Sequence, residues 1–283
     1  MKFAKMQGTG NDYIYVNCFE ETVFDSPAAA KFLSDRHFGV GSDGLVLIEP
    51  SDRADFKMDI YNSDGSRARM CGNAARCVAK YVCDNGLTDK SLISLETPGG
   101  IKYIDTYKEN GKVVSARVNM GAPILKSRDI PALFDSDTVI DLPLKVGEKS
   151  YRVTCLSMGN PHCVIFSNDA DSVNIQKTGP EFENHPAFPD RINTEFVQPL
   201  SGSHIKMRVW ERGAGETLSC GTGACAAAAA CILNGYCKRD TDIAVTLRGG
   251  ELSVNWSADG AVYLTGPAAT VFTGEITCCG GAR

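Results

Sequence analysis

The sequence has few of the features that mark secreted, membrane or nucleic-acid-binding proteins. Its 283 residues include only 2 Trp and 4 His, and the formal net charge is −5. No basic stretch is long enough to follow a phosphate backbone, so we expect no nucleic-acid partner. The longest apolar run, residues 224–233, is too short to cross a bilayer, so we expect no membrane partner either. The first residues lack the apolar segment of a secretory signal, which favours a cytoplasmic location.

Cysteine is abundant, but it does not follow the patterns of metal sites or disulfide scaffolds. There are 12 cysteines, yet no Cys-x-x-Cys pair, and no histidine is spaced with a cysteine pair as zinc ligands are. In a chain without a recognisable export signal, free thiols are expected rather than disulfides. We therefore predict no metal site, and we interpret most of these cysteines as small buried hydrophobic residues.

Two cysteines stand out because they occupy equivalent places in an internal repeat. Cys71 and Cys220 each open a glycine-containing segment, and their separation is 220 − 71 = 149 residues. The same offset aligns residues 10–86 with 159–235 without a gap. The identities fall at turns, at the two cysteines and at the ends of the expected helices. This placement indicates two homologous domains.

Both copies show the same order of local patterns. Residues 56–61 and 205–210 alternate apolar and polar side chains, which predicts half-buried strands. A polar loop follows, and then a Cys-Gly step opens an alanine-containing stretch that predicts a helix ending at Asn-Gly. Further strand-like runs lie at 44–48, 112–118 and 243–247.

We therefore predict an α+β fold of two homologous domains. Each would be a mostly antiparallel sheet or barrel around a central helix, with the active site in the cleft between the domains. Pro- and Gly-containing segments mark the boundaries, at Met120–Pro123 and Thr265–Pro267. Residues 1–120 with 266–283 would form the N-terminal domain, and residues 121–265 the C-terminal domain.

The position of the two cysteines suggests acid–base chemistry. The N-terminus of a helix carries unpaired N–H groups and a partial positive charge, which favour a thiolate and can bind a carboxylate. We therefore expect both thiols to have lowered pKa values. Racemisation removes a proton from one face of a carbon and returns one to the opposite face. Two matched thiols, one deprotonated and one protonated, supply that arrangement, and no lysine occurs in a recognisable pyridoxal-phosphate setting.

Seven segments, in order, give the chain a close resemblance to the diaminopimelate epimerase family over nearly its whole length. In the first half they are residues 8–12 (GTGND), 61–66 (YNSDGS) and 70–77 (MCGNAARC). In the second half they are residues 159–162 (GNPH), 193–197 (NTEFV), 211–217 (ERGAGET) and 219–223 (SCGTG).

The resemblance implies interconversion of LL- and meso-2,6-diaminoheptanedioate, in lysine and peptidoglycan precursor biosynthesis, with no cofactor and no metal. It implies that Cys71 and Cys220 are the catalytic acid–base pair. His162 and Glu211 would tune and orient the thiols. The substrate, a small molecule, would be held by these residues: Asn11, Asn62, Gly72, Asn73, Asn160, Asn193, Glu211, Arg212, Gly221 and Thr222.

One position departs from the family, and two other functions stay open. Many family members carry Gln near the position of Gly44, so one amide contact must come from elsewhere or be absent. Arg76 lies inside the expected helix, and we interpret it as structural. A proline or hydroxyproline racemase would use the same two cysteines, although its substrate has no second amino-acid end to bind. A thiol–disulfide redox protein is the other alternative, and a homodimer is left open.

Overall fold

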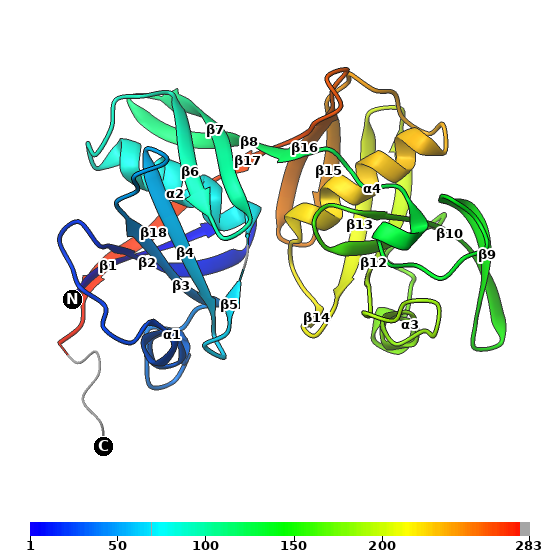
Figure 1. Cartoon of the computed structure of the whole chain (residues 1–283), viewed down its shortest axis with the longest axis horizontal. Helices are drawn as coiled ribbons and strands as arrows, with labels where there is room; N and C mark the ends of the chain where they lie inside the picture. The colour runs from blue at the N-terminus through cyan, green and yellow to red at the C-terminus, as the bar shows by residue number, and fades with distance from the viewer. Residues whose placement is uncertain (69, 278–283) are drawn as a thin grey trace. The chain divides into compact units, whose positions relative to one another are not determined.

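The computed structural model describes residues 1–68 and 70–277. The chain divides into two compact units. The first unit holds Met1–Asn119 and the segment from Thr265 onward, and the second unit holds Met120–Leu264. Strands β8 (Lys112–Gly121) and β17 (Val262–Pro267) carry the chain across the two boundaries (Figure 1).

The first unit is a mainly antiparallel sheet with two helices. Its remaining elements are β1 (Lys2–Gly8), β2 (Asn11–Asn17), α1 (Ser26–Ser34), β3 (Gly44–Glu49), β4 (Phe56–Asn62), β5 (Arg67–Ala68), α2 (Gly72–Asp84), β6 (Leu92–Thr97), β7 (Gly100–Glu109) and β18 (Ala269–Glu275). Strand β1 pairs with β2 and β18, and β3 with β4, in antiparallel fashion, whereas β2–β3 and β4–β6 are parallel. Helix α2 packs against β1, β2, β7 and β18, so it forms the core of this unit.

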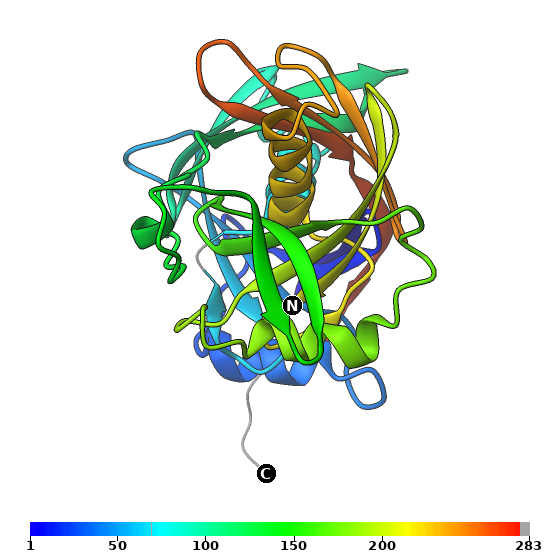
Figure 2. The ribbon, with the colours of Figure 1, turned by 90° about the vertical axis from the view of Figure 1, so that its right-hand side faces the viewer.

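The second unit repeats this plan. Its elements are η1 (Ser127–Asp129), β9 (Val139–Val146), β10 (Lys149–Ser157), β11 (Pro161–Phe166), α3 (Ile175–Glu183), β12 (Asn193–Ser201), β13 (His204–Glu211), β14 (Gly215–Glu216), α4 (Gly221–Leu233), β15 (Ile243–Leu247) and β16 (Gly250–Trp256). Helix α4 packs against β10–β13, β15 and β16, and Figure 2 shows it enclosed by strands.

The structure confirms the predicted repeat down to single residues. Adding the offset 220 − 71 = 149 to the bounds of α1 and α2 gives the bounds of α3 and α4. The strand register is also conserved, because Tyr13 pairs with Gly44 and, at the same offset, His162 pairs with Asn193. Residues that share an offset therefore occupy the same place in each unit.

Both main helices end where the sequence predicts. Asn85 and Asn234 are the C-caps, and Gly86 and Gly235 follow with φ of 72° and 78°. Only glycine adopts this left-handed conformation without strain, so the two Asn-Gly steps stop the helices.

A second, shorter helix in each unit was not predicted. Asp25 is the N-cap of helix α1, and its side chain accepts a hydrogen bond from the N–H of Ala28. A proline lies in the first turn of the helix. Helix α3 contains Gly179 and Pro180, which lower the helix propensity of its sequence. A Cβ on Gly179 would lie 2.4 Å from Cδ2 of Trp210, so the glycine is needed for Trp210 to pack against α3.

In the described part of the chain, no helix is both long and apolar enough to cross a membrane. Residues 1–68 and 70–277 contain no group of three or more His, Cys, Asp or Glu side chains that could hold a metal ion.

Candidate active site

Cys71 is the N-cap of α2, at the end of a polar cluster in the first unit. Its Sγ lies 3.4 Å from Oδ1 of Asn11, which also accepts a hydrogen bond of 3.3 Å from Nδ2 of Asn73. Nδ2 of Asn11 in turn donates to Asp43 at 2.7 Å. The structure therefore brings together three of the predicted site residues, Asn11, Cys71 and Asn73. Asp43, which anchors Asn11, was missed by the sequence analysis.

Asn62 and Gly44 lie across from each other on neighbouring strands of the same unit. Asn62 ends β4, where its Nδ2 donates to Ser66 at 2.9 Å, and its backbone pairs with Gly44 of β3. A Cβ on Gly44 would lie 2.1 Å from the carbonyl oxygen of Tyr61 and 2.8 Å from Cε1 of Tyr13. The backbone here leaves no room for a side chain, so no amide from position 44 can contribute to this site.

Cys220 is the N-cap of α4, and it is buried. It is 6% exposed, and its Sγ lies 3.5 Å from Oγ1 of Thr222. A Cβ on Gly223 would lie 2.8 Å from Oε1 of Glu195 and 3.3 Å from the Sγ of Cys220. The absence of a side chain at Gly223 therefore allows a buried carboxylate and the thiol to approach the same turn of the helix.

His162 and Glu195 form a fully buried pair near this turn. Both side chains are 0% exposed, and Nδ1 of His162 lies 2.7 Å from Oε1 of Glu195. Nε2 of His162 lies 3.0 Å from Oδ1 of Asn160, a residue predicted to belong to the site. Burial raises the pKa of Glu195, whereas the charge and hydrogen bond of His162 lower it.

Glu195 was not among the predicted site residues. The sequence did hold a signal, because Glu195 is two residues after Asn193 in a strand and therefore lies on the same face of the sheet. A carboxylate is rarely buried without a partner.

Cys220 contradicts the prediction that a helix N-terminus lowers the pKa of both thiols. Burial, together with the negative charges of Glu211 and Glu195, raises the pKa of Cys220 well above its ordinary value. Hydrogen bonds from Thr222 and from the backbone N–H of Gly223 act in the opposite direction but have smaller effects. The predicted direction was wrong for Cys220 because desolvation and two carboxylates outweigh the helix dipole. Cys220 therefore holds its proton at neutral pH.

This cause of the raised pKa can be tested on Glu211. Replacing Glu211 with Gln removes one of the two negative charges that raise the pKa of Cys220. The thiolate fraction at any pH below that pKa should then increase, and iodoacetamide should alkylate Cys220 several-fold faster. Residue-resolved mass spectrometry across a pH series measures the rate. Glu216→Gln is the matched control, since Glu216 pairs with Arg208 and Arg248; an equal rate increase in both variants would contradict the assignment.

The remaining predicted residues of the second unit lie on β12, on β13 and in the turn that follows β13. Asn193 accepts a hydrogen bond of 2.9 Å from the backbone N–H of Arg212 and donates to the carbonyl of Pro161 at 2.9 Å. Glu211 accepts a hydrogen bond from Oγ1 of Thr217. The guanidinium of Arg212 is exposed and donates to the carbonyl of Asp190 at 2.8 Å.

The starts of the two main helices provide the same set of backbone groups. Gly72 and Asn73 open α2, and Gly221 and Thr222 open α4. N–H groups in the first turn of a helix have no acceptor within the helix, so they are available to bind an anion. Each unit thus presents a thiol beside a potential carboxylate site.

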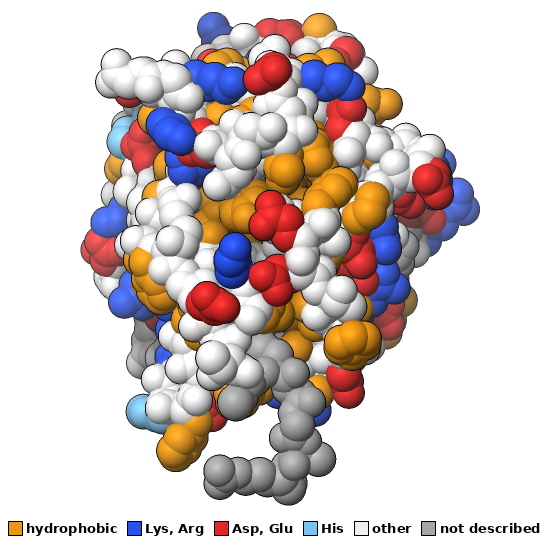
Figure 3. Space-filling view, turned by 90° about the vertical axis from the view of Figure 1, so that its left-hand side faces the viewer, with side chains coloured by type: hydrophobic (Ala, Val, Ile, Leu, Met, Phe, Trp, Pro, Cys, Tyr) orange, Lys and Arg blue, Asp and Glu red, His pale blue; other side chains and the backbone are white. Residues whose placement is uncertain are grey.

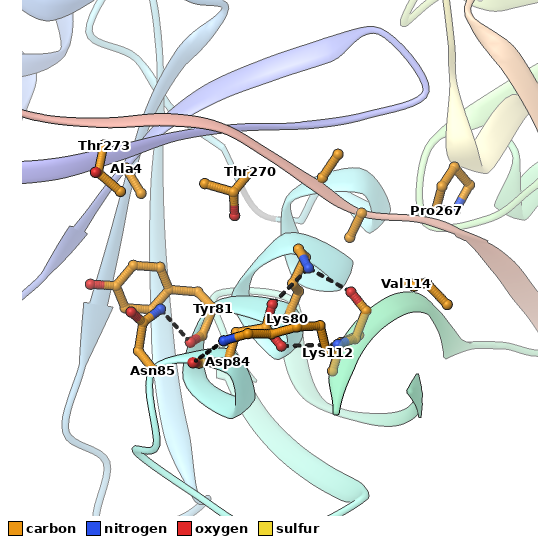
Figure 4. A pocket seen from close by; sticks show the side chains of 13 residues that line it. Ala4, Lys80, Tyr81, Asp84, Asn85, Lys112, Val114, Pro267, Thr270 and Thr273 are labelled. Carbon is orange, nitrogen blue, oxygen red and sulfur yellow. Dashed lines mark hydrogen bonds and ion pairs between the residues drawn. The ribbon is translucent and has the colours of Figure 1, made fainter. Parts of the chain in front are cut away.

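A separate cavity of about 580 Å³ lies in the first unit, and its lining is shown in Figure 4. Lys80 donates to Asp84 at 2.7 Å, and Nζ of Lys112 donates to the carbonyl of Asp84 at 3.1 Å. The second carboxylate oxygen of Asp84 accepts the backbone N–H of Val113 at 2.9 Å. Because these charged groups bond to one another, and because the lining contains none of the predicted site residues, we do not assign the cavity to the active site.

Comparison with solved structures defines the fold class. A probable proline racemase from Agrobacterium radiobacter K84 superposes with a TM-score of 0.69 at 15% identity, covering 98% of this chain and 92% of that one. A phenazine biosynthesis protein of the PhzF family from Bacillus anthracis also gives 0.69, at 16% identity, covering 98% and 99%. At such low identity the similarity shows the fold alone. The chain therefore has the fold that these two proteins share.

Sequence comparison then gives the family. The profile of the family described as diaminopimelate epimerase matches residues 3–126 and 154–271. The diaminopimelate epimerase of Acetivibrio thermocellus is 54% identical over 277 residues, covering 98% of this chain and 98% of its own. That of Agathobacter rectalis is 55% identical over 284 residues, covering 98% and 99%. This chain belongs to the diaminopimelate epimerase family.

Proposed function

We propose that this protein interconverts LL- and meso-2,6-diaminoheptanedioate by a two-base proton transfer between Cys71, Cys220 and the substrate α-carbon. The observation that carries the proposal is the occurrence of one cysteine at the N-cap of each of two equivalent helices. Membership of the diaminopimelate epimerase family gives the substrate and the isomerase reaction, which belongs to lysine biosynthesis.

The reaction is divided between a thiolate and a thiol. The thiolate removes the α-proton, and the electron pair left on carbon is delocalised into the α-carboxylate. The thiol then delivers its proton to the opposite face of the carbon. Cys220, whose pKa is raised by burial and by two carboxylates, is the protonated member of the pair at rest. Each cysteine is therefore the base in one direction of the reaction and the acid in the other, and solvent exchange restores the starting protonation states between turnovers.

The negative charge that develops on the carboxylate needs fixed hydrogen-bond donors. We assign this role to the first-turn N–H groups of Gly72 and Asn73 in α2 and of Gly221 and Thr222 in α4. Donors held in place by a helix stabilise developing charge without reorganising during the reaction. Each proposed domain supplies one thiol and one set of these N–H donors. The two domains are residues 1–120 with 266–283, and residues 121–265.

The other polar residues are proposed to position the substrate and the thiols. Asn11 contacts Cys71 directly and holds its orientation, while Glu211 and the His162–Glu195 pair set the charge around Cys220. The side chains assigned to the distal amino-acid end of the substrate are Asn62, Asn160, Asn193, Glu211 and Arg212.

Arg212 provides a test of specificity. A guanidinium binds a carboxylate through two parallel hydrogen bonds, whereas an ammonium group cannot reproduce that geometry. Arg212→Lys should lower kcat/KM for diaminopimelate about 10- to 100-fold, the loss expected for a charge-assisted hydrogen bond. The alkylation rates of Cys71 and Cys220 should be unchanged, which separates a loss of substrate binding from damage to the thiols. Unchanged kcat/KM would show that Arg212 does not bind substrate.

The direct test of the proposed function is incubation with LL-diaminopimelate, followed by chiral separation of the stereoisomers. Formation of meso-diaminopimelate, in the presence of a chelator and without added pyridoxal phosphate, is the expected result. L-Proline and trans-4-hydroxy-L-proline are the comparison substrates, since a hydroxyproline epimerase shares the fold. Inversion of proline in place of diaminopimelate would contradict the proposal.

The proposed binding partner is the small-molecule substrate, diaminopimelate. A homodimer stays a prediction. Figure 3 shows hydrophobic side chains gathered over the middle of one face, with acidic and basic side chains around and among them. Exposed apolar patches of this kind are typical of surfaces that bind another protein.

A further inference from the structure

Two cysteines outside the proposed active site lie side by side at the far end of α4. Cys231 is in the last turn of the helix, and Cys237 follows the turn that ends it. Both are free thiols, and the Sγ of Cys237 also lies 4.0 Å from the carbonyl oxygen of Ser201. No role in the epimerase reaction has been assigned to either residue.

The helix stop brings these two cysteines together. The N–H of Gly235 donates to the carbonyl of Ile232 at 3.1 Å, and the N–H of Tyr236 to that of Cys231 at 2.8 Å. This is the paired bonding of a Schellman turn, in which the chain folds back over the last turn of its helix. The N–H of Cys237 then lies 3.3 Å from the carbonyl oxygen of Cys231, so the backbones of the two cysteines are in contact.

The internal repeat shows that this pair is not a requirement of the fold. In the first unit the same turn follows α2, where the N–H of Leu87 donates to the carbonyl of Val82 at 2.9 Å. Since 231 − 149 = 82 and 237 − 149 = 88, the equivalents of the two cysteines are Val82 and Thr88. An equivalent turn therefore forms with residues that cannot be oxidised to a disulfide.

We propose that Cys231 and Cys237 are a redox modification site, at which a small-molecule disulfide oxidises the pair to a reversible disulfide that fastens the last turn of α4. Cys237 reacts first, because it is 5% exposed and lies between exposed residues, Tyr236 and Lys238, whereas Cys231 is 0% exposed. The neighbouring thiol of Cys231 also lowers the pKa of Cys237, which favours its thiolate.

The chemistry is a pair of exchange steps. The thiolate of Cys237 attacks one sulfur of the small disulfide, forming a mixed disulfide and releasing one small thiolate. Cys231 then loses its proton and attacks the sulfur of Cys237, releasing the second small thiolate. The protein loses two protons and two electrons, and the oxidant is reduced to two thiols.

The experiment uses oxidised glutathione on the full-length protein, followed by alkylation of the remaining thiols. Chymotrypsin cleaves after Leu233 and Tyr236, which both lie between the two cysteines, so their peptides stay joined only if a disulfide connects them. Wild-type protein should give this joined pair, with loss of two alkylatable thiols and recovery of both after reduction. Cys231→Val and Cys237→Thr, which introduce the residues of the first unit, are the matched variants.

The two variants should behave differently. In Cys231→Val the mixed disulfide with glutathione should persist at Cys237, because nothing resolves it, whereas in Cys237→Thr Cys231 should stay reduced. Cys155 and Cys163, which pair across β10 and β11 at 1% and 0% exposure, are the internal control and should stay reduced. The proposal is overturned if wild-type Cys237 stops at the glutathione adduct, if Cys231 remains alkylatable, or if Cys155 and Cys163 join at the same rate.

Discussion

Replacement of either Cys71 or Cys220 with alanine should lower kcat for epimerisation by at least about 10²- to 10⁴-fold, the usual contribution of a general acid or base. Each thiol serves as the base in one direction and as the acid in the other, so neither direction survives the loss of one. The measurement is the rate of meso-diaminopimelate formation by each purified variant, with circular dichroism to confirm the fold.

The double variant should be little worse than either single variant. Groups that act as one unit lose most of their effect when the first is removed, so their losses do not add. Cys83→Ala is the matched control, since Cys83 lies in α2 with its Sγ 3.5 Å from the carbonyl oxygen of Lys90. Ordinary activity in Cys71→Ala or Cys220→Ala would end the two-base account, as would a full additive loss in the double variant.

Arg76→Met should cause the largest loss of stability among the substitutions considered. Arg76 is 0% exposed, in the second turn of α2. Its guanidinium donates to Oδ1 of Asn73 at 2.9 Å, to Oγ1 of Thr9 at 3.2 Å and to the carbonyl of Pro267 at 3.2 Å. Methionine fills similar space but leaves these acceptors without their donor, at a cost of about 1–3 kcal/mol for each buried group.

The free energy of unfolding should therefore fall by about 3 kcal/mol or more, measured by urea denaturation. Arg128→Met is the matched control, because the side chain of Arg128 is 79% exposed and that of its ion-pair partner Asp129 is 50% exposed. Exposed ion pairs contribute about 0–1 kcal/mol, so this variant should unfold close to wild type. Equal losses in the two variants would show that the buried bonds of Arg76 contribute little.

The repeat, the two main helices and the strands around them could be predicted from the sequence because their signals are local. Cys-Gly at a helix start, Asn-Gly at its end and apolar–polar alternation each report on neighbouring residues. A shared offset then linked the two halves. The helices α1 and α3 were missed although they obey the same offset. In α3 the reason is that Gly179 and Pro180 lower the helix propensity of its sequence.

The electrostatics of the site could not be predicted from spacing. Cys71 and Cys220 occupy equivalent positions, so the sequence suggests equal thiols. The structure shows that Cys220 is buried near two carboxylates, one of which, Glu195, has Val46 as its equivalent in the first unit at 195 − 149 = 46. The pKa of a thiol depends on burial and on charges from distant strands, which no local pattern reports.

The central claim is that two different groups handle the departing and the incoming proton, and isotope exchange in deuterated water tests it most directly. A cysteine that has equilibrated with solvent delivers the incoming proton. Meso-diaminopimelate formed from LL-diaminopimelate in the first turnovers should therefore carry deuterium at the inverted α-carbon, while the remaining substrate carries little. Mass spectrometry and proton NMR of both stereoisomers measure this. Early product that retains protium at the inverted carbon would contradict the two-base mechanism.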